Sequence, residues 1–211
     1  MQKRYKYPRT FHLPISPGVT EDDKVLNDLS SFIGKEVIVT EKMDGENTSI
    51  YNDYFHARSI DSNSHISQSY VKGMIASVRF LLKRGERICG ENMFAKHSIE
   101  YNDLPSYFLG FSFWQEDICL DWDNTIDKFN HLGIIPVPQF YRGIFDLDQI
   151  LKQFEEYKIK QNHEVEGFVI RLSDSFTRHD FNKSVIKYVR ENHVQTDQHW
   201  KNQKIIPNKL K

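Results

Sequence analysis

Short runs of β-branched and apolar residues recur along the chain and predict β-strands. Residues 37–40 and 48–51 form two such runs, on either side of Asp44 and Gly45, a pair of residues typical of turns. Four later runs have the same character: ERICGENM, YFLGFSFW, EGFVIRL and SVIKYVR. Charged residues stand at the ends of these runs or within them, so the strands are expected to carry chemistry as well as a core.

A second spacing, with apolar residues three or four apart, predicts helices. It is clearest over residues 67–84, where Gly85 suits the position after a helix end. Residues 123–131, followed by Gly133, and residues 146–158 predict two more helices. Because strands come in groups with helices between them, the pattern predicts an α+β fold with antiparallel sheets flanked by helices.

The ends of the chain differ from this regular middle. YPRTFHLPISPG contains three prolines, which predicts an ordered extended arm or loop, with a short helix expected after it. Without a low-complexity linker or an internal repeat, residues 1–211 are expected to form a single domain. Because only about twenty residues follow Arg190, we expect no further C-terminal domain.

Composition narrows the class of protein. The 211 residues are 39% hydrophobic and 13% aromatic, enough for a core, and contain no apolar run long enough to cross a bilayer. The polar, basic start is unlike a signal peptide, so we expect a cytoplasmic protein with no membrane association. The spacing of Cys89 and Cys119 suits neither a disulfide framework nor a zinc site. A formal net charge of -1 neither requires nor excludes nucleic acid, although both ends are locally basic.

The segment EKMDGEN places Lys42 at the end of a predicted strand, between Glu41 and the turn residues Asp44 and Gly45. A lysine amine attacks phosphorus only when neutral, and at pH 7 only about one lysine in a few thousand is neutral. We therefore expect burial, neighbouring cations or a metal to depress its pKa. By itself, KMDG is also compatible with a solvated lysine on a surface hairpin.

Three other strands carry charges with no structural reason to be there. RICGENMF runs into Glu91, EVEGFVIR opens on Glu166, and Lys187 interrupts the β-branched run SVIKYVR. Charges inside a sheet are costly unless they face a ligand, a metal or a partner charge. Each has a bland alternative, either a strand-end carboxylate in solvent or a lysine on an edge strand. Together they predict one site where acids and a base converge.

In this order, KMDG, RICGENMF, YFLGFSFW, EGFVIR and SVIKYVR resemble motifs I, III, IIIa, IV and V of the covalent nucleotidyltransferases, and among these the ATP-dependent RNA ligases. The similarity covers roughly residues 37–190. YPRTFHLP and HVQTDQHW resemble features of a group of small bacterial and phage RNA ligase domains. The resemblance implies an ATP-grasp-like ligase catalytic domain that uses ATP with Mg²⁺ or Mn²⁺.

Roles follow from the resemblance residue by residue. Lys42 is the implied nucleophile, which attacks the α-phosphate of ATP to form lysyl-AMP. Glu91 and Lys187 complete the implied catalytic set, with Glu91 accepting a ribose hydroxyl and Lys187 contacting the α-phosphate. Glu166 and Asp44 are the implied metal ligands. The implied ATP-binding residues are Glu41, Lys42, Asp44, Gly45, Asn47, Arg58, Glu91, Phe111, Glu166 and Lys187.

Two positions stay open. Phe111 is the implied platform for adenine, but Phe113 is a rival, and an aromatic residue in a strand is commonly a core residue. Many relatives carry two basic residues one apart in motif V. This chain has Val189 two residues after Lys187, which leaves the second phosphate contact unassigned.

The implied reaction joins RNA ends, as in RNA repair: AMP moves from Lys42 to an RNA 5′-phosphate, and a 3′-hydroxyl then displaces it. The expected lack of an oligonucleotide-binding or helical C-terminal domain argues against capping enzymes and most DNA ligases. It leaves open a catalytic domain whose protein partner supplies nucleic-acid binding. A noncatalytic nucleic-acid-binding module of the same fold is the alternative from another class.

Overall fold

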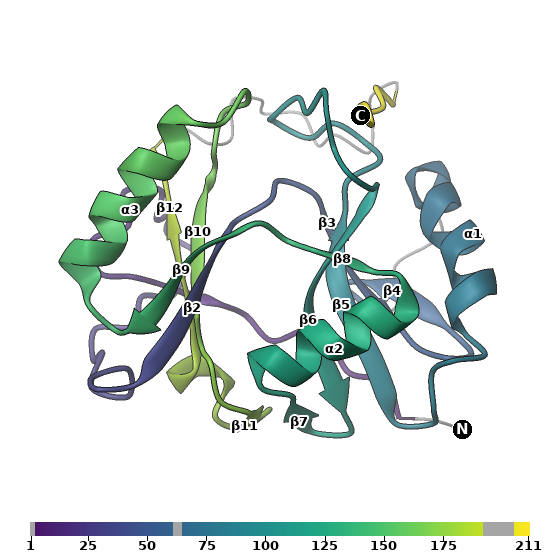
Figure 1. Cartoon of the computed structure of the whole chain (residues 1–211), viewed down its shortest axis with the longest axis horizontal. Coiled ribbons are helices and arrows are strands. Elements are labelled where there is room, and N and C mark those ends of the chain that lie inside the picture. The colour runs from purple at the N-terminus through teal and green to yellow at the C-terminus, as the bar shows by residue number, and fades with distance from the viewer. Residues whose placement is uncertain (1–2, 61–64, 192–204) are drawn as a thin grey trace.

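The computed structural model describes residues 3–60, 65–191 and 205–211, and HVQTDQHW lies outside them. The described residues build two sheets, one on each side of the view in Figure 1, with three α-helices packed on them. Nearly all strand pairs are antiparallel; β1 with β12 and β6 with β8 are the parallel pairs between named strands in the described part of the chain. The predicted α+β class with antiparallel sheets is confirmed.

The first sheet holds five strands in the order β1-β12-β10-β2-β9. Their bounds are Phe11–His12 (β1), Val185–Val189 (β12), Gly167–Leu172 (β10), Glu36–Glu41 (β2) and Gln139–Ile144 (β9). Helix α3, Leu147–Ile159, begins after Asp146, whose side chain accepts from the Gln149 amide as an N-cap. Its buried residues Ile150 and Phe154 share one apolar cluster with residues of β2, β10 and β12.

The second sheet follows the order β11-β7-β6-β5-β3-β4, with β8 paired to β6. Its strands are Phe176–Thr177 (β11), Ile118–Cys119 (β7), Phe108–Gln115 (β6), Glu86–Asn92 (β5), Glu46–Ile50 (β3), Phe55–Ala57 (β4) and Ile135–Pro136 (β8). Helices α1, Ser69–Val78, and α2, Trp122–Leu132, contribute Val71, Val78 and Phe129 to the same buried cluster as residues of β5 and β6. Two short 3₁₀ turns, Ile66–Gln68 and Phe181–Lys183, complete the elements.

The helix boundaries confirm two predictions and correct two. Helix α2 ends at Gly133 in the left-handed conformation, with φ 67°, and α3 matches its predicted range closely. The helix expected over residues 67–84 instead ends at Val78. Gly85 does have a positive φ of 92°, but it belongs to the turn before β5 and not to the end of the helix. The apolar spacing extends to Leu82 because that side chain is buried even though it lies beyond the helix. No helix follows the N-terminal arm among residues 18–35, which form turns, irregular chain and a β-bridge between Val25 and His12.

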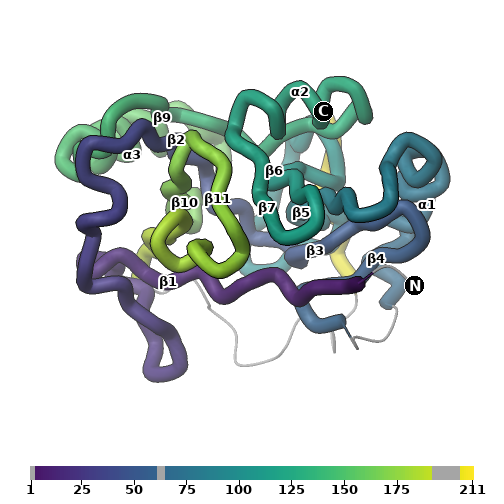
Figure 2. The backbone as a smooth tube through the Cα atoms, turned by 90° about the horizontal axis from the view of Figure 1, so that it is seen from below, coloured from purple at the N-terminus to yellow at the C-terminus, as the bar shows by residue number. Residues whose placement is uncertain are grey.

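The N-terminal arm, residues 3–17, contains no helix and only the two-residue strand β1, and its Pro14 and Pro17 lie in turns, which agrees with the predicted arm or loop. The backbone of Tyr5 donates to the Tyr51 hydroxyl at 2.9 Å and accepts from the guanidinium of Arg87, a buried side chain, also at 2.9 Å. Further along, β1 pairs with β12, so the arm touches both sheets. Figure 2 shows it crossing the lower face of the molecule, from near β4 to β1.

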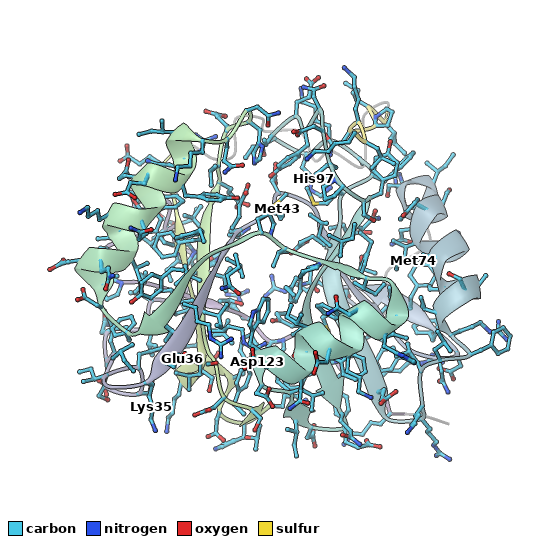
Figure 3. All side chains as sticks on the ribbon, viewed as in Figure 1. Lys35, Glu36, Met43, Met74, His97 and Asp123 are labelled. Carbon is cyan, nitrogen blue, oxygen red and sulfur yellow. The ribbon has the colours of Figure 1, made fainter. Side chains whose placement is uncertain are left out.

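The two sheets are also tied at the surface. Arg142 of β9 pairs with Glu36 of β2 at 3.1 Å and with Asp123 of α2 at 2.6 Å; Figure 3 labels the two acids side by side. These groups are substantially exposed, so the ion pairs contribute little to stability on their own. No helix among the described residues is long and apolar enough to cross a membrane.

Candidate active site

A cavity of about 630 Å³ is lined by residues of both sheets and of the N-terminal arm. Eight of the residues predicted to bind nucleotide line it: Glu41, Lys42, Gly45, Asn47, Arg58, Glu91, Phe111 and Lys187. Glu166 and Asp44 do not line the cavity: Glu166 is bonded to Lys42, which does, and Asp44 lies between the lining residues Met43 and Gly45 in the chain. The structure therefore brings together residues that are up to 146 positions apart, from Glu41 to Lys187.

The segment that carries Lys42 connects the two sheets and is not a hairpin. Strand β2 ends at Glu41 in the first sheet, and β3 begins at Glu46 in the second. Within this segment the Lys42 amide donates to the Gly167 carbonyl at 2.9 Å, and Met43 is buried. Figure 3 labels Met43 between the two halves of the molecule, near His97. The predicted turn at Asp44 and Gly45 is thus a crossing from one sheet to the other.

Asp44 bonds this crossing to the loop that follows β5. Its Oδ2 accepts from the backbone amides of Ser98 and Ile99 at 2.7 and 2.8 Å, and its own amide donates to the Tyr101 hydroxyl at 3.1 Å. Gly45 lies against the backbone of Asn92, where an added Cβ would be 2.9 Å from the Asn92 carbonyl oxygen. Glycine at this position lets the crossing run close to β5.

Lys42 is surrounded by carboxylates. Its Nζ donates to both oxygens of Glu166 at 2.7 Å, and Glu166 is buried. Burial alone would lower the pKa of Lys42, but the charges of Glu166, Glu91 and Asp44 outweigh it and raise the pKa above its ordinary value. The expectation of a depressed pKa is therefore wrong for the protein without ligands, because acids and not cations surround the amine.

Glu91 and Asn47 face each other across strands β5 and β3, where they are register partners. Glu91 Oε2 and Asn47 Oδ1 are buried and have no hydrogen-bond partner among the residues that the structure describes. Burial raises the pKa of Glu91 to about 8, against the opposing charge of Lys42, and the carboxylate of Glu166 adds to the rise. Two polar atoms at the cavity are thus left to a ligand.

Lys187 lies on β12, opposite Val169 of β10, with its Nζ 3.5 Å from Asp23 Oδ1. Burial lowers the pKa of Lys187, and Asp23 opposes that change. Asp23 also lies 3.3 Å from Nε2 of His12, whose own pKa burial and the charge of Lys187 lower to about 4. Sequence reasoning assigned no role to His12, although it lies in YPRTFHLP, or to Asp23. Their position became visible only in the fold, where β1 places His12 beside Lys187 and backbone hydrogen bonds from His12 to Lys24 and from Leu26 to His12 place Asp23 next to it.

No residue takes the place of a second motif V base on β12. Val189 is buried in the first sheet, and Arg190 pairs with Glu164 at 2.8 Å. Arg171 of β10 lines the cavity, but its guanidinium donates to the carbonyls of Leu120 and Leu172. The remaining cations that line the cavity are Arg9 of the N-terminal arm and Arg58 after β4, both exposed.

The register of β6 separates the two candidate aromatic platforms. Phe111 lines the cavity, and its ring meets Tyr7 edge-on at 5.2 Å. Phe113 is fully buried, in the cluster with residues of α1 and α2. Of the two rings, only Phe111 lies where a ligand in the cavity reaches it.

Glu41 lines the cavity, but its carboxylate is already bonded on both oxygens. Oε2 accepts from the Tyr157 hydroxyl at 2.5 Å, and Oε1 lies 2.7 Å from His163 Nε2. Tyr157 belongs to α3 and His163 to the loop after it, while the His163 ring also contacts Tyr101 at 4.7 Å. These contacts hold the residue before Lys42 in place from the side of the first sheet.

Comparisons with known proteins agree on one family. The family model described as RNA ligase matches residues 35–189, whereas no curated protein matches the chain. A mutant of Naegleria gruberi RNA ligase with ATP and Mn superposes with a TM-score of 0.54 at 16% identity, over 79% of this chain and 53% of that one. The same ligase with PPi gives a TM-score of 0.53 at 16% identity, over 92% and 63%. The chain thus spans somewhat more than half the length of the solved structures that it resembles.

Proposed function

Because the chain belongs to the RNA ligase family, we propose that it is an ATP-dependent RNA ligase whose Lys42 takes up AMP. One observation carries the proposal: the amine of Lys42 faces a cavity of nucleotide size while Glu166, 124 positions away in the chain, bonds it at 2.7 Å. ATP, AMP and Mn accompany mutants of the Naegleria gruberi ligase, which supports nucleotide and metal as ligands here.

In the proposed first step, Lys42 Nζ bonds to the α-phosphorus of ATP. The bond from that phosphorus to the bridging oxygen breaks, and pyrophosphate leaves with the electron pair. The amine must also lose a proton, and Glu166 is the group within hydrogen-bond reach to accept it. Because the surrounding acids hold Lys42 protonated in the free protein, its activation depends on what enters the cavity with the nucleotide.

A divalent cation fits this site when phosphate completes its shell. Among the described residues no group of three His, Cys, Asp or Glu could hold a metal alone. Mg²⁺ is commonly held by one or two carboxylates together with substrate phosphates, and Glu166 and Asp44 are the proposed carboxylates. Asp44 has one oxygen engaged by backbone amides, and both oxygens of Glu166 accept from Lys42, so Glu166 would have to release the lysine to hold the cation. Such a cation supplies charge neutralisation on the triphosphate.

The other cavity residues are assigned to binding. Phe111 is proposed to stack on adenine, Glu91 and Asn47 to bond the ribose through their unpartnered oxygens, and Lys187 to contact the α-phosphate. Asp23 and His12 hold Lys187 at that position. Gly45 and Glu41 are proposed to shape the nucleotide site through the backbone, because the carboxylate of Glu41 is engaged elsewhere.

Later steps would transfer AMP from Lys42 to an RNA 5′-phosphate, after which a 3′-hydroxyl attacks that phosphate and releases AMP. Two variants of the proposal make distinct predictions. A domain that needs a protein partner for sealing would form the AMP adduct but join no ends alone. A noncatalytic nucleic-acid-binding module would form no adduct.

The test incubates the protein with ATP labelled at the α-phosphate and Mg²⁺ or Mn²⁺, then denatures it and measures label on the protein. Bound AMP is removed beforehand. Wild type and Lys35→Ala, an exposed lysine just before β2, are expected to label, and Lys42→Ala is not. Unlabelled wild type would exclude the covalent mechanism. GTP in parallel separates a ligase from a capping-type enzyme, and a 5′-phosphorylated RNA tests sealing.

A further inference from the structure

A second cavity, an open groove of about 920 Å³, adjoins the first. The two share Tyr7, Pro8, Arg9, Arg58 and Ser59, so the groove leaves the nucleotide site at its mouth. Its far part is built by Lys6 of the arm and by the β11 segment, including Arg178 and His179. In Figure 2 the arm passes just below β11 and β7, the strands that flank this part.

The groove is basic, although the chain as a whole is not. Lys6, Arg9, Arg58 and Arg178 line it against one acid, Asp117, while the whole chain carries a formal net charge of -1. Four of the chain's 28 lysines and arginines therefore converge on one surface of ten residues. Such a concentration favours an extended anion, because a neutral or cationic partner would gain nothing from it.

Two arginines of the groove, Arg178 and Arg9, are held in position by their neighbours. Arg178 Nε lies 3.0 Å from Asp117 Oδ1, and its guanidinium stacks over the Tyr5 ring at 4.4 Å. Arg9 donates to the Asp22 carbonyl at 2.7 Å. Asp117 is half-exposed, so water screens it and it does not cancel the charge of the arginine. Preorganised guanidinium groups of this kind suit phosphate oxygens.

We propose that this groove binds the phosphate backbone of the RNA strand whose 5′-phosphate receives AMP. The proposal rests on the proposed function, since the 5′-phosphate must reach AMP on Lys42 through the mouth at Arg9 and Arg58. The next phosphates of the strand then lie along Lys6, Arg178 and His179. These three residues do not line the nucleotide cavity, so the triphosphate of ATP does not account for them.

Charge supplies a quantitative expectation. Each phosphate neutralised by a cation on a single strand contributes about -0.7 to the slope of log affinity against log salt. Four contacts give a slope of about -2.8, a loss of roughly 50-fold in affinity between 50 and 200 mM salt. Losing two contacts halves the slope, and the loss over the same range falls to about 7-fold.

The experiment measures binding of a short, fluorescent, 5′-phosphorylated RNA in the absence of ATP, over a salt series. Lys6→Gln/Arg178→Gln is compared with Lys152→Gln/Lys160→Gln, which removes two exposed charges on and after α3. The groove variant is expected to halve the slope, and the α3 variant to keep that of wild type. Equal slopes in all three proteins would overturn the proposal.

Label from ATP on the protein is measured for the same variants. The groove variant is expected to keep the wild-type ATP dependence but to transfer less AMP to the RNA. If it requires more ATP instead, the groove holds the triphosphate and the proposal is wrong. If Arg178→Gln impairs folding, seen as a lowered melting temperature, Lys6→Gln alone must still reduce the slope by about 0.7. Because RNA binding is read without ATP, its outcome is independent of whether Lys42 forms the adduct.

Discussion

The two phenylalanines of β6 provide the sharpest test of the site, because they stand two residues apart on opposite faces of the strand. Phe111 lines the cavity, and Phe113 is fully buried beneath it. Replacing each with alanine removes the same atoms. The two variants should fail in different ways, one in nucleotide binding and the other in stability.

For Phe111→Ala, the loss is a stacking surface for adenine. Stacking of a base on an aromatic ring is worth about 1–3 kcal/mol. Since about 1.4 kcal/mol corresponds to a factor of ten, the ATP concentration needed for half-maximal labelling should rise about 5- to 150-fold. Phe111→Trp, which keeps a ring at the position, should retain most of the affinity. Tyr7, which meets the Phe111 ring edge-on, would remain to limit collapse of the site.

For Phe113→Ala, the loss is core packing. Truncating a buried phenylalanine costs about 3–5 kcal/mol, and in a chain of this size each kcal/mol lowers the melting temperature by roughly 2–4 °C. A drop of about 6–20 °C is expected, with little change in ATP dependence below the transition. Thermal melting and ATP titration of labelling measure both quantities. If Phe111→Ala binds ATP like wild type, or if Phe113→Ala needs more ATP while melting normally, the assignment of the two rings is wrong.

Two further predictions concern stability. The carboxyl group of Glu91 has a pKa near 8 in the folded protein and an ordinary pKa in the unfolded chain. Its contribution to the free energy of unfolding is therefore complete below about pH 4.5 and is lost as the pH rises towards 8. Glu91→Gln should therefore melt like wild type at pH 5 and higher than wild type at pH 9; parallel melting curves over that range would refute the shift. A Cβ at Gly167 would lie 2.0 Å from the Tyr188 carbonyl, so Gly167→Ala should cost about 1–3 kcal/mol in denaturant unfolding. Gly73→Ala, in helix α1 with open space around it, should instead be neutral or slightly stabilising, and equal effects would contradict the close strand contact.

Six of the longer strands and the order of the motifs were predictable because each of those runs carries its own local signal, whereas β9, Gln139–Ile144, was not predicted. Residues 37–40, 48–51 and the later runs all appear as strands close to their predicted bounds. Helix ends were less predictable. The apolar spacing that continues to Leu82 reflects burial after α1 has ended, and periodicity alone does not separate the two.

The electrostatics of the site could not be predicted because they depend on distant residues. The direction of the Lys42 pKa is set by Glu166 and Glu91, which only the folded sheets bring to it. The same holds for His12, which the pairing of β1 with β12 places beside Lys187, and for Asp23, which hydrogen bonds between His12 and residues 24 and 26 place beside both. Strand periodicity alone predicts that Phe111 and Phe113 share one face of β6. The register between β5 and β6 shifts between Cys89 and Gly90 and leaves Phe111 without a register partner on β5, so the two rings join different apolar clusters.

The crossing between the sheets has a consequence for how this segment can vary. Four residues, 42–45, join the end of β2 to the start of β3. One end is bonded to the carbonyl of Gly167 and the other, through Asp44, to the amides of Ser98 and Ile99. An insertion or deletion would therefore have to be absorbed by shifting a strand in one sheet or the other. The length of this crossing is therefore under as strict a constraint as the identity of its residues.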